Sequence, residues 1–233
     1  MAVGSCVAHS IAEVIEYHNW VQNADDEAMS TGWIYGNRRE TNYKGEGMYT
    51  KDAIATTCKY GCVPLTLLPY NYEMPKAGEL FEERYDKIAS QALYSRFSGY
   101  YRTRTVSEIK KALMTDGPVV FAVTWYQDNK VVEGVLQRGK KRNGGHCMVI
   151  YGWDERGWKI MNSWGIFWGD CGKAILPYDY PIEEAYGVTD NILDKRTDIL
   201  HPFSENKFLK ILAKILNFFS GIIVTIKNFF NKK

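Results

Sequence analysis

Three residues that together could form a thiol hydrolase site lie far apart in this 233-residue chain. Cys6 begins a segment with helical spacing of apolar residues, and His146 and Asn162 lie in two apolar runs separated by a short turn. A thiol reacts as its thiolate, and the positive end of a helix dipole favours that anion. His146 would act as the base and then protonate the leaving amine, while Asn162 would orient the imidazole. The pattern therefore predicts nucleophilic hydrolysis by a Cys-His-Asn triad.

Two motifs around these residues resemble the papain family of cysteine peptidases. Residues 4–10, Gly-Ser-Cys-Val-Ala-His-Ser, are similar to the family's Gly-Ser-Cys-Trp-Ala-Phe/His-Ser, with Val7 where an aromatic is usual. Residues 162–172 resemble the family's Asn-Ser-Trp-Gly-x-x-Trp-Gly-x-x-Gly block. His146 follows Cys6 by 140 residues, within the family's spacing of roughly 130–150. The two motifs and their spacing together are specific to this family.

The resemblance covers about residues 1–182, including a match at residues 59–70 to a segment common in microbial members. It implies an α+β, papain-like fold of two lobes with the active-site cleft between them. The peptidase domain would span residues 1–192. Its helical left lobe would be about residues 1–99, and its β-barrel-like right lobe about residues 100–192.

The resemblance also implies roles for residues around the predicted triad. Trp164 would shield the bond between the catalytic histidine and asparagine from water. Gly47 lies where the family's glycine-containing strand pairs with an extended peptide, and the carbonyl of Gly145 would receive a substrate N–H. Trp168 is carried over as a further substrate-binding residue. For Gly47, an ordinary turn glycine is the alternative interpretation.

One part of the family's site has no counterpart in the sequence. The family's oxyanion hole combines the backbone N–H of the nucleophilic cysteine with a glutamine six residues before it. In this chain the N–H of Cys6 would be the remaining donor, because the glutamine position would precede Met1. We expect a truncated start rather than an impaired member, since the rest of the site is intact.

Apolar spacing predicts the elements that must position the triad. Apolar residues recur at helical intervals after Cys6, and strand-like runs fill the second half of the chain. A mostly helical half would face a mostly β half, with Cys6 on one wall and His146 and Asn162 on the other. Helices are expected at 6–20, 51–59, 79–92 and 106–114, and strands at 118–126, 131–137, 146–153, 158–164 and 173–176.

Composition and charge argue against several classes of function. The formal net charge of +2 gives no case for nucleic-acid binding. No metal or organic cofactor is implied, because the other cysteines fit neither a zinc site nor a secreted disulfide framework. We predict these four as small buried thiols of the cytoplasmic type: Cys58, Cys62, Cys147 and Cys171. No secretory signal precedes Cys6, and the sequence leaves the localisation open.

Two other functions remain open on the sequence alone. One is a catalytically impaired papain-like module that lacks the oxyanion glutamine and binds extended peptides. The other is a thiol amidase or acyl transferase that acts on a non-protein amide. The block at residues 162–172 resembles peptidases specifically. We therefore predict a cysteine endopeptidase that cleaves a peptide or protein substrate through a thioester acyl-enzyme.

Residues 193–233 are predicted to be a linker followed by a basic amphipathic helix. From Lys207 onward the polar positions fall in one narrow stripe at helical spacing, and no acidic residue follows Glu205. The longest uncharged run, residues 215–226, has 12 residues and is short of the about 20 needed to span a bilayer. We expect residues 206–233 to lie in the plane of an anionic membrane surface. A helix docked on the domain or on a partner, and a spanning anchor, are the alternatives.

Deleting residues 204–233 should abolish binding to anionic liposomes and leave the peptidase domain folded. Each lysine near an anionic surface contributes about 1 kcal/mol to binding, and burial of the apolar face adds to this. Co-sedimentation with vesicles that contain phosphatidylserine measures the effect, with neutral vesicles as the control. Ile215→Asp and Ile222→Asp should weaken binding as the deletion does. If the shortened protein aggregates, the helix belongs to the core and the membrane hypothesis is wrong.

Overall fold

The chain divides into two compact units, residues 1–191 and 192–233, and the computed structural model describes most of the first. The predicted tail helix lies outside the described residues. Within the part of the chain that is described, no helix is both long and apolar enough to cross a membrane. The described residues are 4–40, 45–69 and 85–190.

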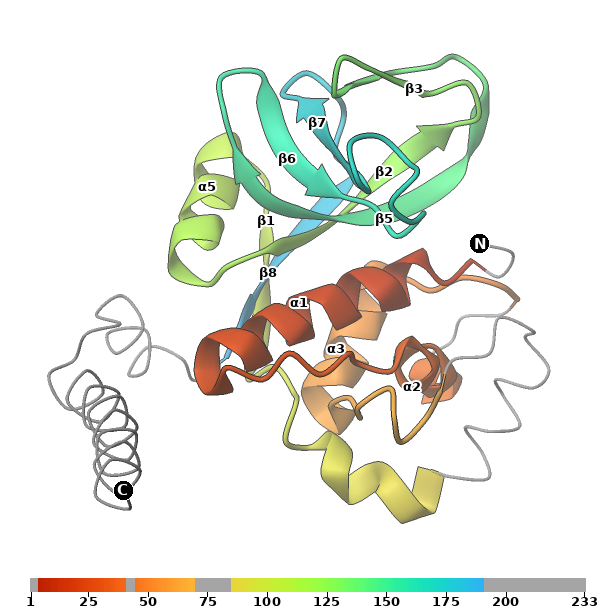
Figure 1. The fold of residues 1–233 in the computed structure, drawn as a ribbon, viewed down its shortest axis with the longest axis vertical. Helices are drawn as coiled ribbons and strands as arrows, with labels where there is room; N and C mark the ends of the chain where they lie inside the picture. Colours follow the sequence, from red (N-terminus) through yellow and green to blue (C-terminus); the bar gives the residue numbers. More distant parts are fainter. Residues whose placement is uncertain (1–3, 41–44, 70–84, 191–233) are drawn as a thin grey trace, which may run out of the picture. The chain divides into compact units, whose positions relative to one another are not determined.

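The first unit combines a helical lobe with a lobe built on one sheet, so the α+β, two-lobed prediction is confirmed (Figure 1). Besides the labelled helices named next, residues 85–92 are helical. The helices are α1 (Cys6–Asn23), α2 (Thr31–Gly36), the 3-10 helix η1 (Asn37–Glu40), α3 (Thr50–Tyr60) and α5 (Val106–Thr115). The strands are β1 (Gly99–Thr103), β2 (Val119–Tyr126), β3 (Lys130–Val132), β4 (Val135–Gln137), β5 (Arg142–Trp153), β6 (Gly157–Met161), β7 (Lys173–Pro177) and β8 (Glu184–Thr189).

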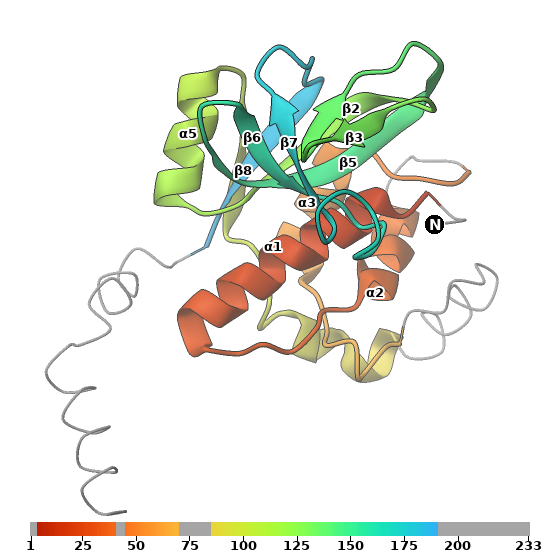
Figure 2. The same cartoon turned by 45° about the horizontal axis from the view of Figure 1, so that its top comes forward.

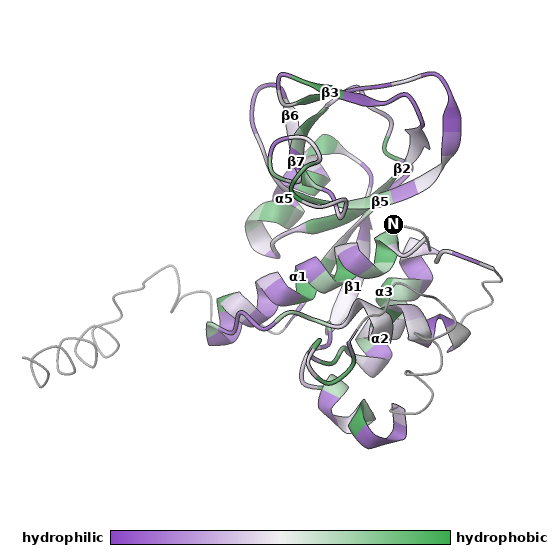
Figure 3. Cartoon of the chain, turned by 45° about the vertical axis from the view of Figure 1, so that its right-hand side comes forward, coloured by the Kyte–Doolittle hydropathy of each residue, from purple (hydrophilic) through white to green (hydrophobic). Residues whose placement is uncertain are grey.

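The long helix α1 joins the two lobes. Its buried residues recur every three or four positions and so share one face of the helix. The helix ends at Asn23, because Ala24 adopts a left-handed conformation and its N–H donates to the carbonyl oxygen of Trp20. α1 packs against β5, and Figure 3 shows hydrophobic stretches of the strand above the helix. This contact brings the first turn of α1 beside the strand.

The eight strands form a single sheet in the order β1-β8-β2-β5-β6-β7-β4-β3. Neighbouring strands are antiparallel except for β4 and β7, which are parallel. Figure 2 shows β2, β5, β6 and β7 curving together above α1. β5 is the longest strand and lies at the middle of the sheet, so its side chains reach both lobes.

Two separate hydrophobic cores share β5 as a common wall. Side chains alternate along a strand. Cys147 and Val149 therefore pack with the helical lobe, while Met148 and Ile150 pack inside the sheet lobe. Each fully buried apolar side chain of this size contributes about 1.5–3 kcal/mol to stability. Packing on both faces consequently fixes which residues of β5 face α1.

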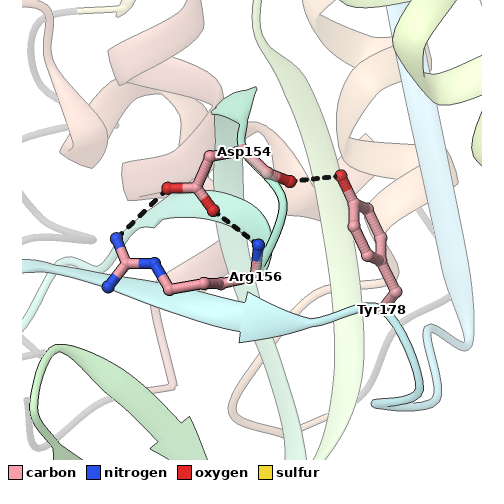
Figure 4. A network of polar contacts seen from close by, with 3 residues as sticks. All are labelled: Asp154, Arg156 and Tyr178. Atoms are coloured by element: carbon pink, nitrogen blue, oxygen red, sulfur yellow. Dashed lines mark hydrogen bonds and ion pairs between the residues drawn. The ribbon is translucent and has the colours of Figure 1, made fainter.

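The turn between β5 and β6 is held by polar contacts around Asp154 (Figure 4). The Asp154 carboxylate accepts hydrogen bonds from the main-chain N–H of Arg156 at 2.9 Å and from its guanidinium at 3.1 Å. The Tyr178 hydroxyl donates to the main-chain carbonyl oxygen of Asp154 at 2.8 Å. These contacts fix the hairpin whose strands lead back to His146 and forward to Asn162.

Two strands predicted from the sequence differ from the structure. The single strand predicted at 131–137 is a hairpin, because residues 133–134 turn the chain and β3 pairs with β4. Because valines flank that turn on both sides, the sequence of residues 131–137 looks like a single apolar strand. The strand predicted at 158–164 ends at Met161, so Asn162 lies in the connection that follows. Sequence reasoning also missed four short elements, α2, η1, β1 and β8.

The prediction that the four other cysteines are buried is wrong for Cys171, which is exposed. Cys171 lies in a turn before β7 with a φ of 51°, outside both cores. Cys58 is half-buried, and only Cys62 and Cys147 are fully buried. All four are free thiols, as is Cys6.

α1 carries a carboxyl group into the packed region near β5. Burial raises the pKa of Glu13 to about 8 from an ordinary 4.5, and the nearby charge of Glu16 adds to the rise. Glu13 also lies close enough to Cys147 to raise the pKa of that thiol. At neutral pH the folded protein therefore keeps Glu13 protonated, whereas the unfolded chain ionises it. The free energy of unfolding should fall as the pH rises from 4.5 to about 8.

Glu13→Gln should remove this part of the pH dependence. One pKa unit corresponds to about 1.4 kcal/mol, so the variant should exceed the parent in stability by up to a few kcal/mol near pH 8. Chemical unfolding near pH 5 and near pH 8 measures the difference. Glu155→Gln is the control, because Glu155 is exposed and its substitution should leave the parent's pH dependence unchanged. Equal pH dependence in the parent and Glu13→Gln would show that Glu13 is already ionised in the folded protein.

Candidate active site

The pairing of β5 with β6 brings His146 and Asn162 together. Val149 pairs with Met161, the last residue of β6, so the next position brings Asn162 level with Met148. Side chains alternate along a strand, and His146 therefore shares a face with Met148. Nε2 of His146 lies 2.8 Å from Oδ1 of Asn162. Both residues are buried, so water has little access to this hydrogen bond.

The connection after β6 holds Asn162 in this position. Its main-chain N–H donates to the carbonyl oxygen of Gly172 at 2.9 Å. The amide nitrogen Nδ2 of Asn162 is buried and has no hydrogen-bond partner among the described residues. The orientation of the amide therefore depends on its bond to His146.

Cys6 reaches the same region from the helical lobe. It is the first residue of α1, where the helix offers no internal acceptor for its N–H. The main-chain N–H of Cys147 in β5 hydrogen-bonds to the Cys6 sulfur. Because Cys147 directly follows His146, this contact sets the thiol beside the part of β5 that carries the imidazole.

Two glycines allow the chain to pass close to the start of α1. Gly4 has a φ of 55°, and a Cβ there would come within 3.0 Å of the main-chain nitrogen of Gly47. The N–H of Gly47 donates to the Tyr35 hydroxyl at 3.2 Å. The Arg38 guanidinium donates to the same hydroxyl at 2.7 Å and to the Gly45 carbonyl oxygen at 2.6 Å. These contacts hold residues 45–47 as one wall beside Cys6.

Cys6 and His146 line one pocket of about 300 Å³. Gly47 and Gly145, both predicted to contact substrate, line the same pocket, whereas Trp164 and Trp168 lie outside it. Two larger pockets, of about 430 and 470 Å³, lie on the sheet lobe and contain none of the predicted triad. We assign the site to the smaller pocket because it holds a thiol and an imidazole together.

Aromatic rings surround the imidazole on the side of the sheet lobe. The Trp164 ring centroid lies 4.8 Å from that of His146, with the rings tilted by 33°. Trp125 lies 5.0 Å from His146 and 4.9 Å from Trp164, in edge-to-face geometry. Trp168 is 6.2 Å from Trp164 and packs against the core of the sheet lobe. These rings keep the imidazole in an apolar environment.

That environment shifts the ionisation of both reactive groups. Burial raises the pKa of the Cys6 thiol, and hydrogen bonds from main-chain N–H groups, first that of Cys147, lower it again in part. Burial lowers the pKa of His146 to about 4, and the hydrogen bond to Asn162 opposes that shift. Each group alone is therefore held in its neutral form. A thiolate and an imidazolium form here only as a pair, when their attraction outweighs the loss of hydration.

Sequence reasoning missed two residues around this pocket. Trp125 lies in the strand predicted at 118–126, but its contact with the imidazole depends on the pairing of β2 with β5. Glu184 begins β8, which was not predicted, and it lines the pocket because it pairs with Ala122 of β2. Alternating apolar residues after Glu184 are the signal that could have identified this strand.

The described residues include no cluster of three or more His, Cys, Asp or Glu side chains that could hold a metal ion. The groups gathered here instead suit chemistry carried by the side chains themselves: the thiol and imidazole that line the pocket and the amide bonded to that imidazole, with the main-chain N–H of Cys6 at the start of α1. This set can supply a nucleophile, a proton carrier, an orienting acceptor and a donor to an oxyanion.

Comparison with known proteins relates this chain to cysteine proteases. The family model described as "Papain family cysteine protease" matches residues 2–181. An uncharacterized peptidase C1-like protein of Acanthamoeba polyphaga mimivirus is 26% identical over 225 residues, which cover 88% of this chain and 71% of that protein. The cathepsin B-like cysteine proteinase 6 of Caenorhabditis elegans is 30% identical over 150 residues, 53% of this chain. The chain spans only 40% of that relative's length.

Solved structures share the fold. Xylellain, a cysteine protease from Xylella fastidiosa, has a TM-score of 0.69 at 22% identity, and the match covers 80% of each chain. Procathepsin B S9 from Trypanosoma congolense has a TM-score of 0.65 at 20% identity, covering 81% of this chain and 69% of that one. At these identities the likeness establishes the architecture.

Proposed function

The chain belongs to the papain family of cysteine proteases, and we propose that it is an active endopeptidase whose triad is Cys6, His146 and Asn162. The family implies a peptide or protein as substrate. The observation that carries the proposal is the 2.8 Å contact between Nε2 of His146 and Oδ1 of Asn162 at a pocket that Cys6 also lines. With Nε2 engaged by Asn162, the other ring nitrogen is left to exchange a proton with the thiol.

In the proposed reaction the Cys6 thiolate attacks the carbonyl carbon of the peptide bond and forms a tetrahedral oxyanion. The N–H of Cys6 donates a hydrogen bond to that oxyanion in this mechanism. The imidazolium of His146 gives its proton to the leaving amine, the C–N bond breaks, and a thioester remains on Cys6. His146 then takes a proton from water, which attacks the thioester and releases the acid and the thiol.

Two opposing effects decide how much of the reactive ion pair exists. Burial disfavours both the thiolate and the imidazolium, as the raised pKa of Cys6 and the lowered pKa of His146 indicate. Mutual attraction, the start of α1 and the main-chain N–H of Cys147 favour the charged pair. Asn162 adds to this, because its carbonyl oxygen accepts a hydrogen bond from the charged ring more strongly than from the neutral ring.

Cys6→Ala should abolish hydrolysis of peptide substrates while the fold remains intact. His146→Ala should lower kcat/KM by roughly 10²–10⁴-fold, the usual contribution of a general acid–base group. Alkylation by iodoacetamide, followed residue by residue with mass spectrometry, should modify Cys6 first at mildly acidic pH. Circular dichroism of each variant provides the control for folding.

The pH profile of alkylation distinguishes the peptidase from a papain-like module that only binds peptides. A thiolate–imidazolium pair predicts reaction of Cys6 well below the ordinary thiol pKa of about 8.5. If alkylation of Cys6 rises only above that pH and peptides bind without cleavage, the chain is a binding module. If Cys58 or Cys171 reacts faster than Cys6, the assignment of the nucleophile is wrong.

The charge of the pocket supports a preference for basic substrates. Glu46 and Glu184 are the carboxylates among the residues that line it, and the lining includes no lysine or arginine. Glu184, the first residue of β8, accepts a hydrogen bond from the Tyr186 hydroxyl at 3.0 Å, and this bond fixes the position of its carboxylate. We propose that the pocket accepts an arginine or lysine side chain from the acyl part of the substrate.

Glu184→Gln should lower the preference for arginine over leucine in this pocket by about tenfold, equivalent to ~1.4 kcal/mol. Matched coumarin amides that differ at one acyl-side residue measure the ratio of kcat/KM values. Glu183→Gln is the control, because Glu183 is the adjacent exposed carboxylate and does not line the pocket. An unchanged ratio in Glu184→Gln, or an equal change in Glu183→Gln, would contradict the proposed role.

A further inference from the structure

Residues 45–47, which form the wall beside Cys6, have little regular structure of their own. They belong to neither a helix nor a strand, and Gly45 and Gly47 have φ values of 91° and 103°. Among the described residues, no hydrogen bond between main-chain groups ties residues 45–48 to another segment. The position of this wall therefore depends mainly on contacts with side chains.

Tyr35 and Arg38 supply such contacts. The Tyr35 side chain is 2% exposed and packs in the core of the helical lobe. Its hydroxyl accepts hydrogen bonds from the N–H of Gly47 at 3.2 Å and from the Arg38 guanidinium at 2.7 Å. One nitrogen of that guanidinium, Nη1, also donates to the carbonyl oxygens of Gly45 at 2.6 Å and Gly47 at 3.4 Å. The two side chains therefore hold both the N–H and the carbonyl oxygen of Gly47.

The guanidinium is itself placed by the ring to which it bonds. Its central carbon lies 4.1 Å from the centroid of the Tyr35 ring, so the cation lies over the aromatic face. A phenol fixed in the core thus orients a cation, and the cation orients the main chain of a surface segment. A lysine at position 38 could supply the charge but not the planar group with several donors.

The opposite side of the wall rests on the chain just before Cys6. A Cβ on Gly4 would lie 3.0 Å from the main-chain nitrogen of Gly47, so the two segments are already in close contact. The wall is consequently held between Gly4 on one side and Tyr35 and Arg38 on the other. The predicted triad is positioned by different contacts, the packing of α1 on β5 and the pairing of β5 with β6. The wall and the triad can therefore be perturbed separately.

We propose that Arg38 and Tyr35 are positioning residues, which hold the carbonyl oxygen of Gly47 where it accepts a main-chain N–H from the acyl part of the substrate. This inference rests on the proposed peptidase function and on the predicted contact of Gly47 with substrate. A carbonyl oxygen has two acceptor positions, so it can bind a substrate N–H while Arg38 stays in place. Neither Arg38 nor Tyr35 lines the pocket, so both act through Gly47. Their loss should raise KM and leave kcat nearly unchanged.

Two coumarin amides with the same capped two-residue acyl part test the proposal. One is methylated on the main-chain nitrogen of the residue farther from the cleaved bond, which removes the hydrogen-bond donor. In the parent protein, methylation should lower kcat/KM about tenfold, as for the loss of one well-placed hydrogen bond. Arg38→Ala should raise KM for the unmethylated amide about tenfold with kcat nearly unchanged. In that variant methylation should have little further effect.

Further variants separate this role from a general loss of structure. Tyr35→Phe keeps the ring in the core and removes only the hydroxyl. It should also raise KM, and its combination with Arg38→Ala should be less than additive because the two residues act as a unit. Arg38→Lys should restore KM only in part. Alkylation of Cys6 by iodoacetamide should proceed at the parent's rate in each variant.

Arg96→Ala is the matched control, because Arg96 is an exposed arginine that does not line the pocket. It should keep the parent's KM and the full effect of methylation. Equal effects of methylation in the parent and in Arg38→Ala would contradict the proposal. A fall in kcat at unchanged KM, or slower alkylation of Cys6 in Arg38→Ala, would also overturn it, because the pair would then act on the thiol.

A parent protein that hydrolyses neither amide would overturn the proposed function and leave the positioning role to be judged by binding. Methylated and unmethylated peptides with the same acyl sequence are then titrated while tryptophan fluorescence is followed. Tighter binding of the unmethylated peptide, lost in Arg38→Ala and kept in Arg96→Ala, supports the role. Equal or undetectable binding of the two peptides by the parent, or a preference that Arg38→Ala retains, overturns it.

Discussion

The packing of α1 against β5 is the contact on which the whole site depends. Val7 and Ile11 of the helix share a core with Cys147 and Val149 of the strand. A shift of the strand by one residue would turn every side chain to the opposite face and move His146 away from Asn162. A rotation of the helix would likewise move Cys6. The dense apolar contacts of two lobes therefore set the geometry of three polar groups.

The same packing makes the region between the lobes almost free of isolated charge. Burial holds the pKa of His146 near 4, raises that of Cys6, and raises that of Glu13 to about 8. All three groups are therefore neutral when each is considered alone at neutral pH. In the proposed mechanism a proton moves from the thiol to the imidazole, and the low-polarity surroundings tie these two ionisations together. The carboxylate of Glu184 is half-exposed at the pocket, where we propose that it binds a substrate cation.

The predicted triad could be chosen from the sequence because its three residues lie in short motifs with local structural meaning. Cys6 starts an apolar-periodic helix, and His146 and Asn162 flank a hairpin, so their environment can be predicted from neighbours in the chain. The acidic side of the pocket could not be predicted this way. Glu184 reaches it only through the pairing of β8 with β2, two strands that are distant in sequence.

The other differences between the sequence prediction and the structure also arise where local sequence does not determine the conformation. The run at 131–137 is apolar on both sides of its turn, so periodicity alone reads it as one strand. Cys171 lies in a tight turn whose conformation follows from backbone hydrogen bonds, and its apolar character predicted burial that the turn does not provide.

The division of the site between the start of α1 and the β5–β6 hairpin also has a consequence for how the protein is made. Cys6 leaves the ribosome 156 residues before Asn162. At about 5–20 residues per second, this interval lasts roughly 8–30 s. For most of that time the nascent chain carries the thiol without His146, its proposed base. With the proposed triad, proteolytic competence would arise only after the last strands have emerged and closed on the helix, and the polypeptide would be protected from its own chemistry during synthesis.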